Sequence, residues 1–68
     1  MTKRELSKKL EERYGKIFLT MSEAIEASGM GRDTAKAMLY SVQHIGNGRG
    51  KRFFVDDIAE AICNARTN

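Results

Sequence analysis

The residues best suited to chemistry in this 68-residue chain lie between Gly46 and Val55, where the sequence reads GNGRGKRFFV. Three cations, Arg49, Lys51 and Arg52, are interleaved with glycines and are followed by residues that favour strands. Glycine lets the backbone approach a ligand closely, and clustered cations attract anions. The stretch therefore predicts a loop that meets an anionic partner.

Enzymatic and metal chemistry lack the residues that they need. His44 is the sole histidine and Cys63 the sole cysteine, whereas a nucleophile needs an activating base and a metal site needs several ligands. Gly50-Lys51 is followed by Arg52 and a strand pattern, whereas a P-loop continues with Ser or Thr into a helix. We therefore expect no catalysis, no metal and no cofactor, with His44 satisfied locally in a strand and Cys63 a small core residue.

The cations are segregated from the acids. The net charge of +3 is a weak signal, but no Asp or Glu occurs between Thr34 and Val55, a window that holds Lys36 and the three loop cations. This segregation predicts a face that binds nucleic acid. With 41% hydrophobic residues, residues 1–68 are expected to form one globular domain. Without a signal peptide or an apolar run of roughly 20 residues, no membrane is expected and the cytoplasm is the predicted location.

Residues 1–15 read as an additional N-terminal helix. Thr2 and Glu5 form a capping box, and Gly15 would end the helix. Its mixed charges are typical of a solvated surface, although contact with phosphate or pairing of two subunits through the apolar stripe are alternatives. The stripe recurs every four residues, at Leu6, Leu10 and Tyr14.

Residues 20–42 predict a helix-turn-helix that follows a short edge strand at residues 17–19. Thr20 and Glu23 form a second capping box, and the helix that they start would run to Ser28 and stop at Gly29. The next helix would extend from residue 32 to about residue 41. Its inner face would hold Ala35, Met38, Leu39 and Val42, and its outer face Arg32, Asp33, Lys36, Ala37 and Tyr40.

Residues 43–55 predict a hairpin, the wing, whose tight turn contains Asn47-Gly48. On the returning strand, alternation directs Phe53 inward and Phe54 outward, which makes Phe54 a candidate interface residue. The final helix, residues 56–66, would begin at Asp56 or Asp57 and leave a frayed tail. It would bury Ile58, Ile62 and Cys63. The expected fold is α+β and mostly helical: a winged helix-turn-helix with a two- or three-stranded small sheet and an additional N-terminal helix.

Binding to double-stranded DNA explains these features together. The second helix of the pair would enter the major groove, where Arg32 and Lys36 read guanine or hold the backbone. Thr34 would bond to a phosphate or a base, and Asp33 would accept from cytosine or cap its helix. The hairpin would reach the minor groove or backbone, or else remain a flexible solvated loop. The predicted DNA-binding residues are Arg32, Asp33, Thr34, Lys36, Tyr40, Arg49, Lys51 and Arg52.

The segment from Leu19 to Ile62 resembles the small winged-helix proteins of the phage and transposon excisionase type, which are related to the DNA-binding part of the mercury-resistance-regulator family. Three pieces carry the resemblance: Leu-Thr before a Ser-Glu-Ala helix, Gly-x-x-Arg-x-Thr from Gly29 to Thr34, and Gly-Arg-Gly-Lys-Arg before an Asp-Ile helix. It implies that the helix after the turn enters the major groove while the wing follows a neighbouring backbone or minor groove. Ser28 departs from the pattern, which usually has a large apolar residue there.

Together these features predict a sequence-specific DNA-binding protein of a mobile element without catalytic activity, either an excisionase-like architectural factor or a small prophage transcription regulator. Its expected partners are double-stranded DNA, further copies of the chain bound cooperatively, and an integrase or other phage protein. One alternative is a DNA-binding component of a phage packaging or replication complex. Another is a protein-interaction module that binds no nucleic acid. The candidate interface residues are Leu6, Leu10, Tyr14 and Phe54.

Overall fold

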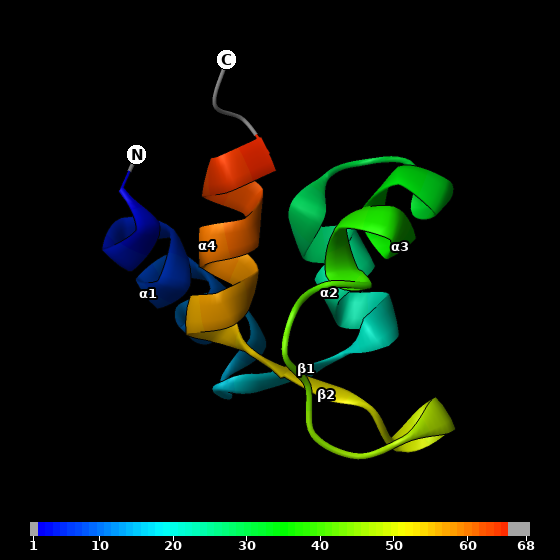
Figure 1. Ribbon diagram of the computed structural model, residues 1–68. Coiled ribbons are helices and arrows are strands. Elements are labelled where there is room, and N and C mark those ends of the chain that lie inside the picture. Colours follow the sequence, from blue (N-terminus) through cyan, green and yellow to red (C-terminus); the bar gives the residue numbers. More distant parts are fainter. Residues whose placement is uncertain (1, 66–68) are drawn as a thin grey trace.

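The computed structural model describes residues 2–65, with the exception of the Arg49 side chain (Figure 1). The elements in chain order are α1 (Lys3–Tyr14), β1 (Phe18–Thr20), α2 (Met21–Ser28), α3 (Arg32–Leu39), the 3-10 turn η1 (Gly48–Gly50), β2 (Arg52–Phe54) and α4 (Val55–Ala65). The described residues thus form a mostly helical α+β fold with a two-stranded antiparallel sheet. The pair α2 and α3 is helix-turn-helix-like. The predicted frayed tail, residues 66–68, lies outside the described residues.

Both predicted capping boxes are present. The Thr2 hydroxyl accepts from the Glu5 amide and the Glu5 carboxylate accepts from the Thr2 amide, each at 3.2 Å. At the start of α2 the reciprocal pair joins Thr20 and Glu23 at 3.2 and 2.9 Å. Because each box satisfies amides that lack an intrahelical partner, these residues define where both helices begin.

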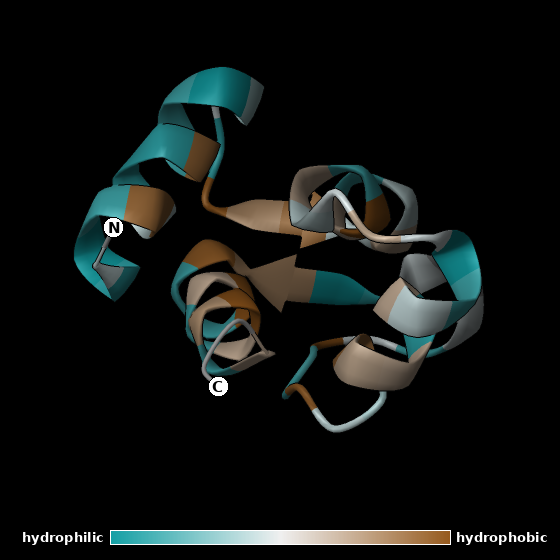
Figure 2. Ribbon diagram, turned by 90° about the horizontal axis from the view of Figure 1, so that it is seen from above, coloured by the Kyte–Doolittle hydropathy of each residue, from teal (hydrophilic) through white to brown (hydrophobic). Residues whose placement is uncertain are grey.

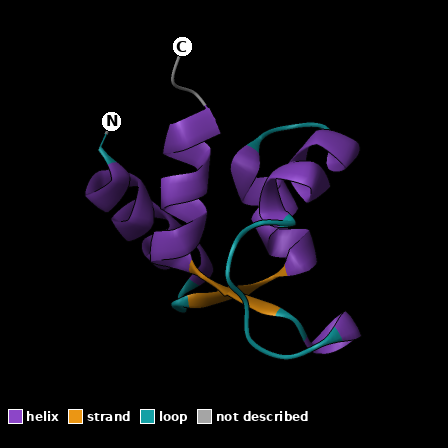
Figure 3. Ribbon diagram, viewed as in Figure 1, coloured by secondary structure: helices purple, strands orange, loops and turns teal. Residues whose placement is uncertain are grey.

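The sheet pairs β2 with a strand that lies far upstream in the chain (Figure 3). Phe18 stands opposite Phe54, and Thr20 stands opposite Arg52. Ile45 adds an isolated bridge to Arg52, with N···O distances of 3.0 and 2.9 Å. The strand expected before the hairpin turn is therefore reduced to one bridged residue.

The tight turn predicted at Asn47-Gly48 is wrong. The favoured two-residue turn needs a positive φ at both residues, but Asn47 is extended with a φ of −132°. Instead, η1 closes the loop, and the Gly50 amide donates to the Asn47 carbonyl at 3.0 Å. Gly46 has a φ of 79°, and a Cβ on it would lie 2.5 Å from the Gly50 carbonyl oxygen. Residues 46–51 are called the glycine loop below.

The core joins the sheet to α1, α3 and α4. Both strands are largely hydrophobic, and α1 lies beside α4 at one end of the molecule (Figure 2). The largest fully buried side chains are Leu19, Leu39, Phe53, Val55 and Ile58. Since these residues come from four elements, each element depends on the others for its buried surface.

The apolar stripe of α1 packs inside the chain, so little of it is left for the pairing of two subunits that the sequence offered as an alternative. Leu10 is only 4% exposed, and Leu6 and Tyr14 are half-buried against the core. The buried Ser7 hydroxyl donates to the Asp56 carboxylate on α4. The apolar surface of the stripe therefore holds α1 against the rest of the fold.

The helix α4 begins at Val55, one residue or more before the predicted start. The Val55 amide donates a hydrogen bond to the carbonyl of Ile17, the residue before β1, at 2.8 Å. The Asp56 carboxylate instead accepts a hydrogen bond from the Ser7 hydroxyl. Cys63 is half-buried, so it is not the core residue that was expected. The residues of α4 that are buried are Val55, Ile58, Ala59 and Ile62.

Candidate nucleic-acid interface

The turn between α2 and α3 is closed by Gly29 and Ser28. Gly29 has a φ of 70°, and its amide donates to the Glu26 carbonyl at 3.2 Å. The Ser28 hydroxyl donates to the Ile25 carbonyl at 2.7 Å and accepts from the Met30 amide at 3.1 Å. The polar residue that departs from the excisionase pattern therefore bonds to the backbone on both sides of the turn and helps to orient α3.

The five residues of α3 and its end that were predicted to bind DNA are all exposed: Arg32, Asp33, Thr34, Lys36 and Tyr40. The helix is held from its other side by Ala35 and Leu39, which are buried. Tyr40 is 92% exposed, the largest value among the exposed large hydrophobic residues. Among the described residues, none of the five side chains takes part in a hydrogen bond or an ion pair. The face is thus available to a partner.

Asp33 does not cap α3 through its side chain. The N-cap residue is Gly31, and no side-chain hydrogen bond is made to the first turn. The Asp33 carboxylate still lies in that turn, where the helix dipole stabilises a negative charge. Its role as an acceptor toward a partner therefore remains open.

The two cations described where the glycine loop meets β2 are less exposed than those of α3. Lys51 and Arg52 are half-buried, and the Arg52 guanidinium donates to the Lys51 carbonyl at 3.0 Å. The Arg49 side chain lies outside the described part of the structure. The backbone at Gly48 and Gly50 is exposed, and a Cβ at either position would meet nothing within 4 Å. The loop therefore offers bare backbone between its cations.

The α3–loop face, which we define as the exposed residues of α3 and residues 46–52, lies at the end of the molecule away from α1 (Figure 1). Asp33 is the sole acid between Arg32 and Val55. The acids of α2 are paired toward α1. Their contacts are Glu23 to Lys16 at 3.0 Å, Glu26 to Arg13 at 3.3 Å, and Glu26 to the Tyr14 hydroxyl at 2.6 Å. The negative charges of α2 are thus partly neutralised.

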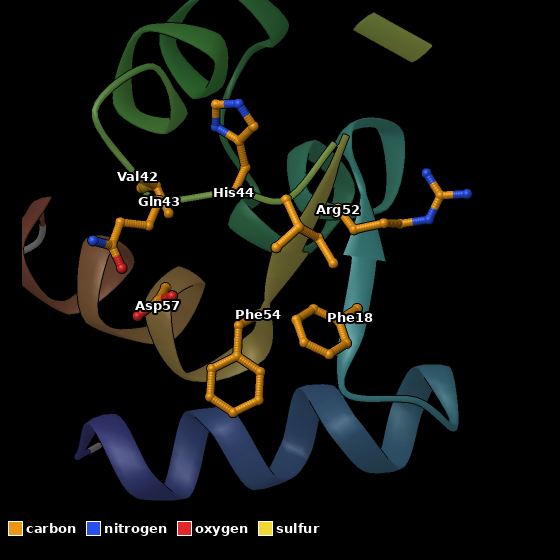
Figure 4. Close-up of a pocket in the computed structure, with 8 residues that line it drawn as sticks. Phe18, Val42, Gln43, His44, Arg52, Phe54 and Asp57 are labelled. Atoms are coloured by element: carbon orange, nitrogen blue, oxygen red, sulfur yellow. The ribbon is translucent and has the colours of Figure 1, made fainter. Parts of the chain in front are cut away.

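Sequence reasoning missed a hollow of about 570 Å³ beside the sheet (Figure 4). The Phe18 and Phe54 rings form one wall, with 5.4 Å between their centroids. Phe54 is therefore half-buried beside Phe18 and does not project freely as predicted. Val42, Gln43, His44, Ile45, Arg52 and Asp57 complete the lining. No sequence pattern could reveal it, because its residues come from separate segments that only the fold brings together.

His44 was expected to be satisfied within a strand, but it is exposed and outside the sheet. Its ring lies 5.8 Å from the Phe53 ring, centroid to centroid. Within residues 2–65, no group of three or more His, Cys, Asp or Glu side chains is placed to hold a metal ion. Over the same residues, no helix has the length and apolar character needed to cross a membrane.

Comparison of the chain with protein-family models, with curated proteins and with solved structures gives no match.

Proposed function

We propose that this chain is a winged helix-turn-helix protein that binds double-stranded DNA sequence-specifically and catalyses no reaction. The observation that carries the proposal is the uncommitted outer face of α3, together with a stretch of sequence from Thr34 to Val55 that holds four cations and no acid. A buried Ala35 and Leu39 fix the helix from behind, so its polar side chains have no role in the core. A polar helix face held rigidly in this way suits recognition of base edges.

The helix α3 has dimensions that fit the major groove. An α-helix with its side chains is about 10–12 Å across, and the groove is about 12 Å wide. Arg32 and Lys36 lie one turn apart on the exposed face. Arg32 at the start of the helix would read guanine or bind a phosphate, and Thr34 would bond to a phosphate or base. Tyr40 at the far end would contact the sugar-phosphate backbone.

The glycine loop would act as the wing. Its exposed glycines let the main chain approach a phosphate closely, while Lys51 and Arg52 supply positive charge. Single DNA-binding modules of this kind bury only about 600 to 1,000 Å². Several copies bound cooperatively along DNA would therefore supply the affinity that one copy lacks.

The resemblance to excisionase-type proteins supports a role in a mobile element, acting in the cytoplasm. In that setting the chain would serve as an architectural factor for recombination beside an integrase, or as a small transcription regulator. A protein that binds and positions DNA needs no catalytic group.

The proposal is tested by measuring affinity for labelled duplexes at several salt concentrations. Each neutralised phosphate adds roughly −0.9 to the slope of log affinity against log salt. We expect Lys36→Ala to weaken all duplexes and to make the slope shallower by about one. Lys8→Ala is the matched control, because Lys8 is an exposed cation on α1 at the other end of the molecule. Binding that is independent of salt, or equal losses in the two variants, would contradict the proposal.

Sequence readout is tested separately by selecting preferred sites from a pool of random duplexes. Arg32→Ala should relax the preference at one or two positions, since a bidentate contact to guanine contributes about 1–3 kcal/mol of discrimination. Lys51→Ala should reduce affinity for every duplex alike. If the chain and both variants select no sequence at all, the binding is electrostatic only and the assignment of α3 is wrong.

A further inference from the structure

A groove runs along α4 and meets the α3–loop face at Arg52. Two hollows of about 570 and 620 Å³ share Val42, Gln43 and Asp57 in their linings, so they form one continuous depression. We call it the α4 groove. The segment 40–46, which forms its rim, crosses in front of the strands next to α4 (Figure 1).

The first hollow of the α4 groove has mainly apolar walls, whereas the second is more polar, with Ser41, Gln43 and Asn64 in its lining. Phe18 is 37% exposed and Ile45 is 55% exposed, and both line the first hollow together with Phe54. Met38 and Ala61 line the second hollow. Adjacent exposed apolar side chains of this kind mark a site of interaction when polar groups surround them.

The charge that faces this groove is negative. Asp57 is half-buried where the two hollows meet, and its carboxylate has no hydrogen bond or ion pair among the described residues. Glu60 lines the second hollow and pairs with Lys3 at 3.3 Å. Arg52 is the sole Lys or Arg of the described lining, and its guanidinium points away from Phe54 and Asp57 (Figure 4). Within residues 2–65, the Asp57 carboxylate is therefore an unpaired negative charge in the groove, and it attracts a cation.

We propose that the α4 groove binds an amphipathic helical segment of a partner protein, with aliphatic side chains against Phe18 and Phe54 and a Lys or Arg against Asp57. An apolar groove with charges at its rim is a recurrent receptor for such helices. Occupation would give the Asp57 carboxylate a counter-charge that the fold itself does not supply. This binding does not depend on the proposed function.

A second copy of the chain does not offer the required segment. The cation-rich helix α1 already buries its apolar stripe, with Leu10 only 4% exposed. The exposed Ile17 follows Lys16, but that ammonium group is paired with Glu23 at 3.0 Å. Helix α3 exposes Arg32 and Lys36, but its aliphatic residues Ala35 and Leu39 are buried, so it offers no aliphatic face to the groove. The occupant is therefore a different protein.

The test uses the intact chain labelled with ¹⁵N and two synthetic peptides, an amphipathic helix of leucine and lysine and its counterpart with glutamate in place of lysine. With the leucine–lysine peptide we expect saturable shifts of the Val42, Phe54 and Asp57 amides. Asp57→Asn should weaken binding roughly tenfold, as expected for loss of one close charge pair. Glu12→Gln is the matched control, since it removes an exposed carboxylate from α1 and should leave the affinity unchanged.

Ile45→Ala provides a second, structurally mild variant, because Ile45 uses its backbone for the bridge and exposes its side chain. It should weaken the leucine–lysine peptide several-fold. The proposal is overturned if the glutamate peptide binds as tightly, or if Glu12→Gln weakens binding as much as Asp57→Asn. It is equally overturned if a DNA duplex displaces the leucine–lysine peptide and protects Asp57 in its place, or if dilution of the chain alone shifts these amides, since a second copy would then be the occupant.

Discussion

At the residue scale, Gly46 is the position at which the glycine loop tolerates no side chain. Its backbone is left-handed, with a φ of 79°, and a Cβ on it would lie 2.5 Å from the Gly50 carbonyl oxygen. Gly46→Ala combines backbone strain with a steric clash, so we expect a loss of about 1–3 kcal/mol in the free energy of unfolding. Denaturant unfolding monitored by circular dichroism measures this loss.

Gly50→Ala is the control for the loop. A Cβ at Gly50 meets nothing within 4 Å, and its φ is not in the left-handed region, so stability should change little. If the two alanine variants are equally stable, the loop does not adopt the close approach of Gly46 to Gly50 in solution.

The roles of single residues were predictable where they depend on near neighbours in the chain. The outer face of α3 follows from helical periodicity, and all five predicted residues there are exposed. The environments of Phe54 and Asp57 were not predictable. Phe54 is covered by Phe18, and Asp57 lines a groove with residues from other elements, which local patterns do not report.

At the element scale, the start of α2 carries a pH-sensitive cap. The pKa of Glu23 is lowered because the Thr20 backbone donates to its carboxylate and because Lys16 lies beside it. A lowered folded-state pKa gives stability that is present above the ordinary value of 4.5 and is lost as the pH falls through the folded value. The cap therefore contributes least in acid.

Glu23→Gln tests this pH dependence. Glutamine keeps an acceptor for the Thr20 amide at every pH, so the variant should lose less unfolding free energy than the parent as the pH drops below 4.5. The measurement is denaturant unfolding near neutrality and in acid, with Glu12→Gln as the control for general charge effects. Parallel losses in parent and Glu23→Gln would show that this carboxylate contributes nothing to the acid response.

Helix boundaries could be read from the sequence more easily than the sheet. The capping boxes at Thr2 and Thr20 involve residues three apart, so the local sequence alone reveals them. The partner of β2 is β1, which lies before both helices of the helix-turn-helix-like pair. The start of α4 likewise depends on the distant Ile17 carbonyl. The strand that pairs with β2 and the first residue of α4 both depend on these long-range contacts, so the sequence did not predict them.

At the scale of the whole molecule, α1 is part of the folding unit. Its Leu10 is buried in the same core as Ile58 and Ile62 of α4. Leu10→Ala should cost about 2–5 kcal/mol, a large share of the roughly 5–15 kcal/mol available to a small domain. We expect the variant to unfold as a single transition at a much lower denaturant concentration, followed by circular dichroism and tyrosine fluorescence.

Leu6→Ala, at a half-buried position of the same stripe, should cost less than Leu10→Ala. Should α1 unfold in a separate step, with the midpoint of the remaining elements unchanged in Leu10→Ala, the single-unit description would be incorrect.

The junction of β2 and α4 contains no connecting residue: Phe54 ends the strand and Val55 begins the helix. The Val55 amide donates a hydrogen bond to the Ile17 carbonyl at 2.8 Å. The side chains of Phe53 and Val55, the residues before and after Phe54, are both buried. The glycine loop and α4 are thus mechanically in series, with no hinge between them to absorb a displacement. A force applied to the glycine loop is transmitted along β2 to the helix that walls the α4 groove.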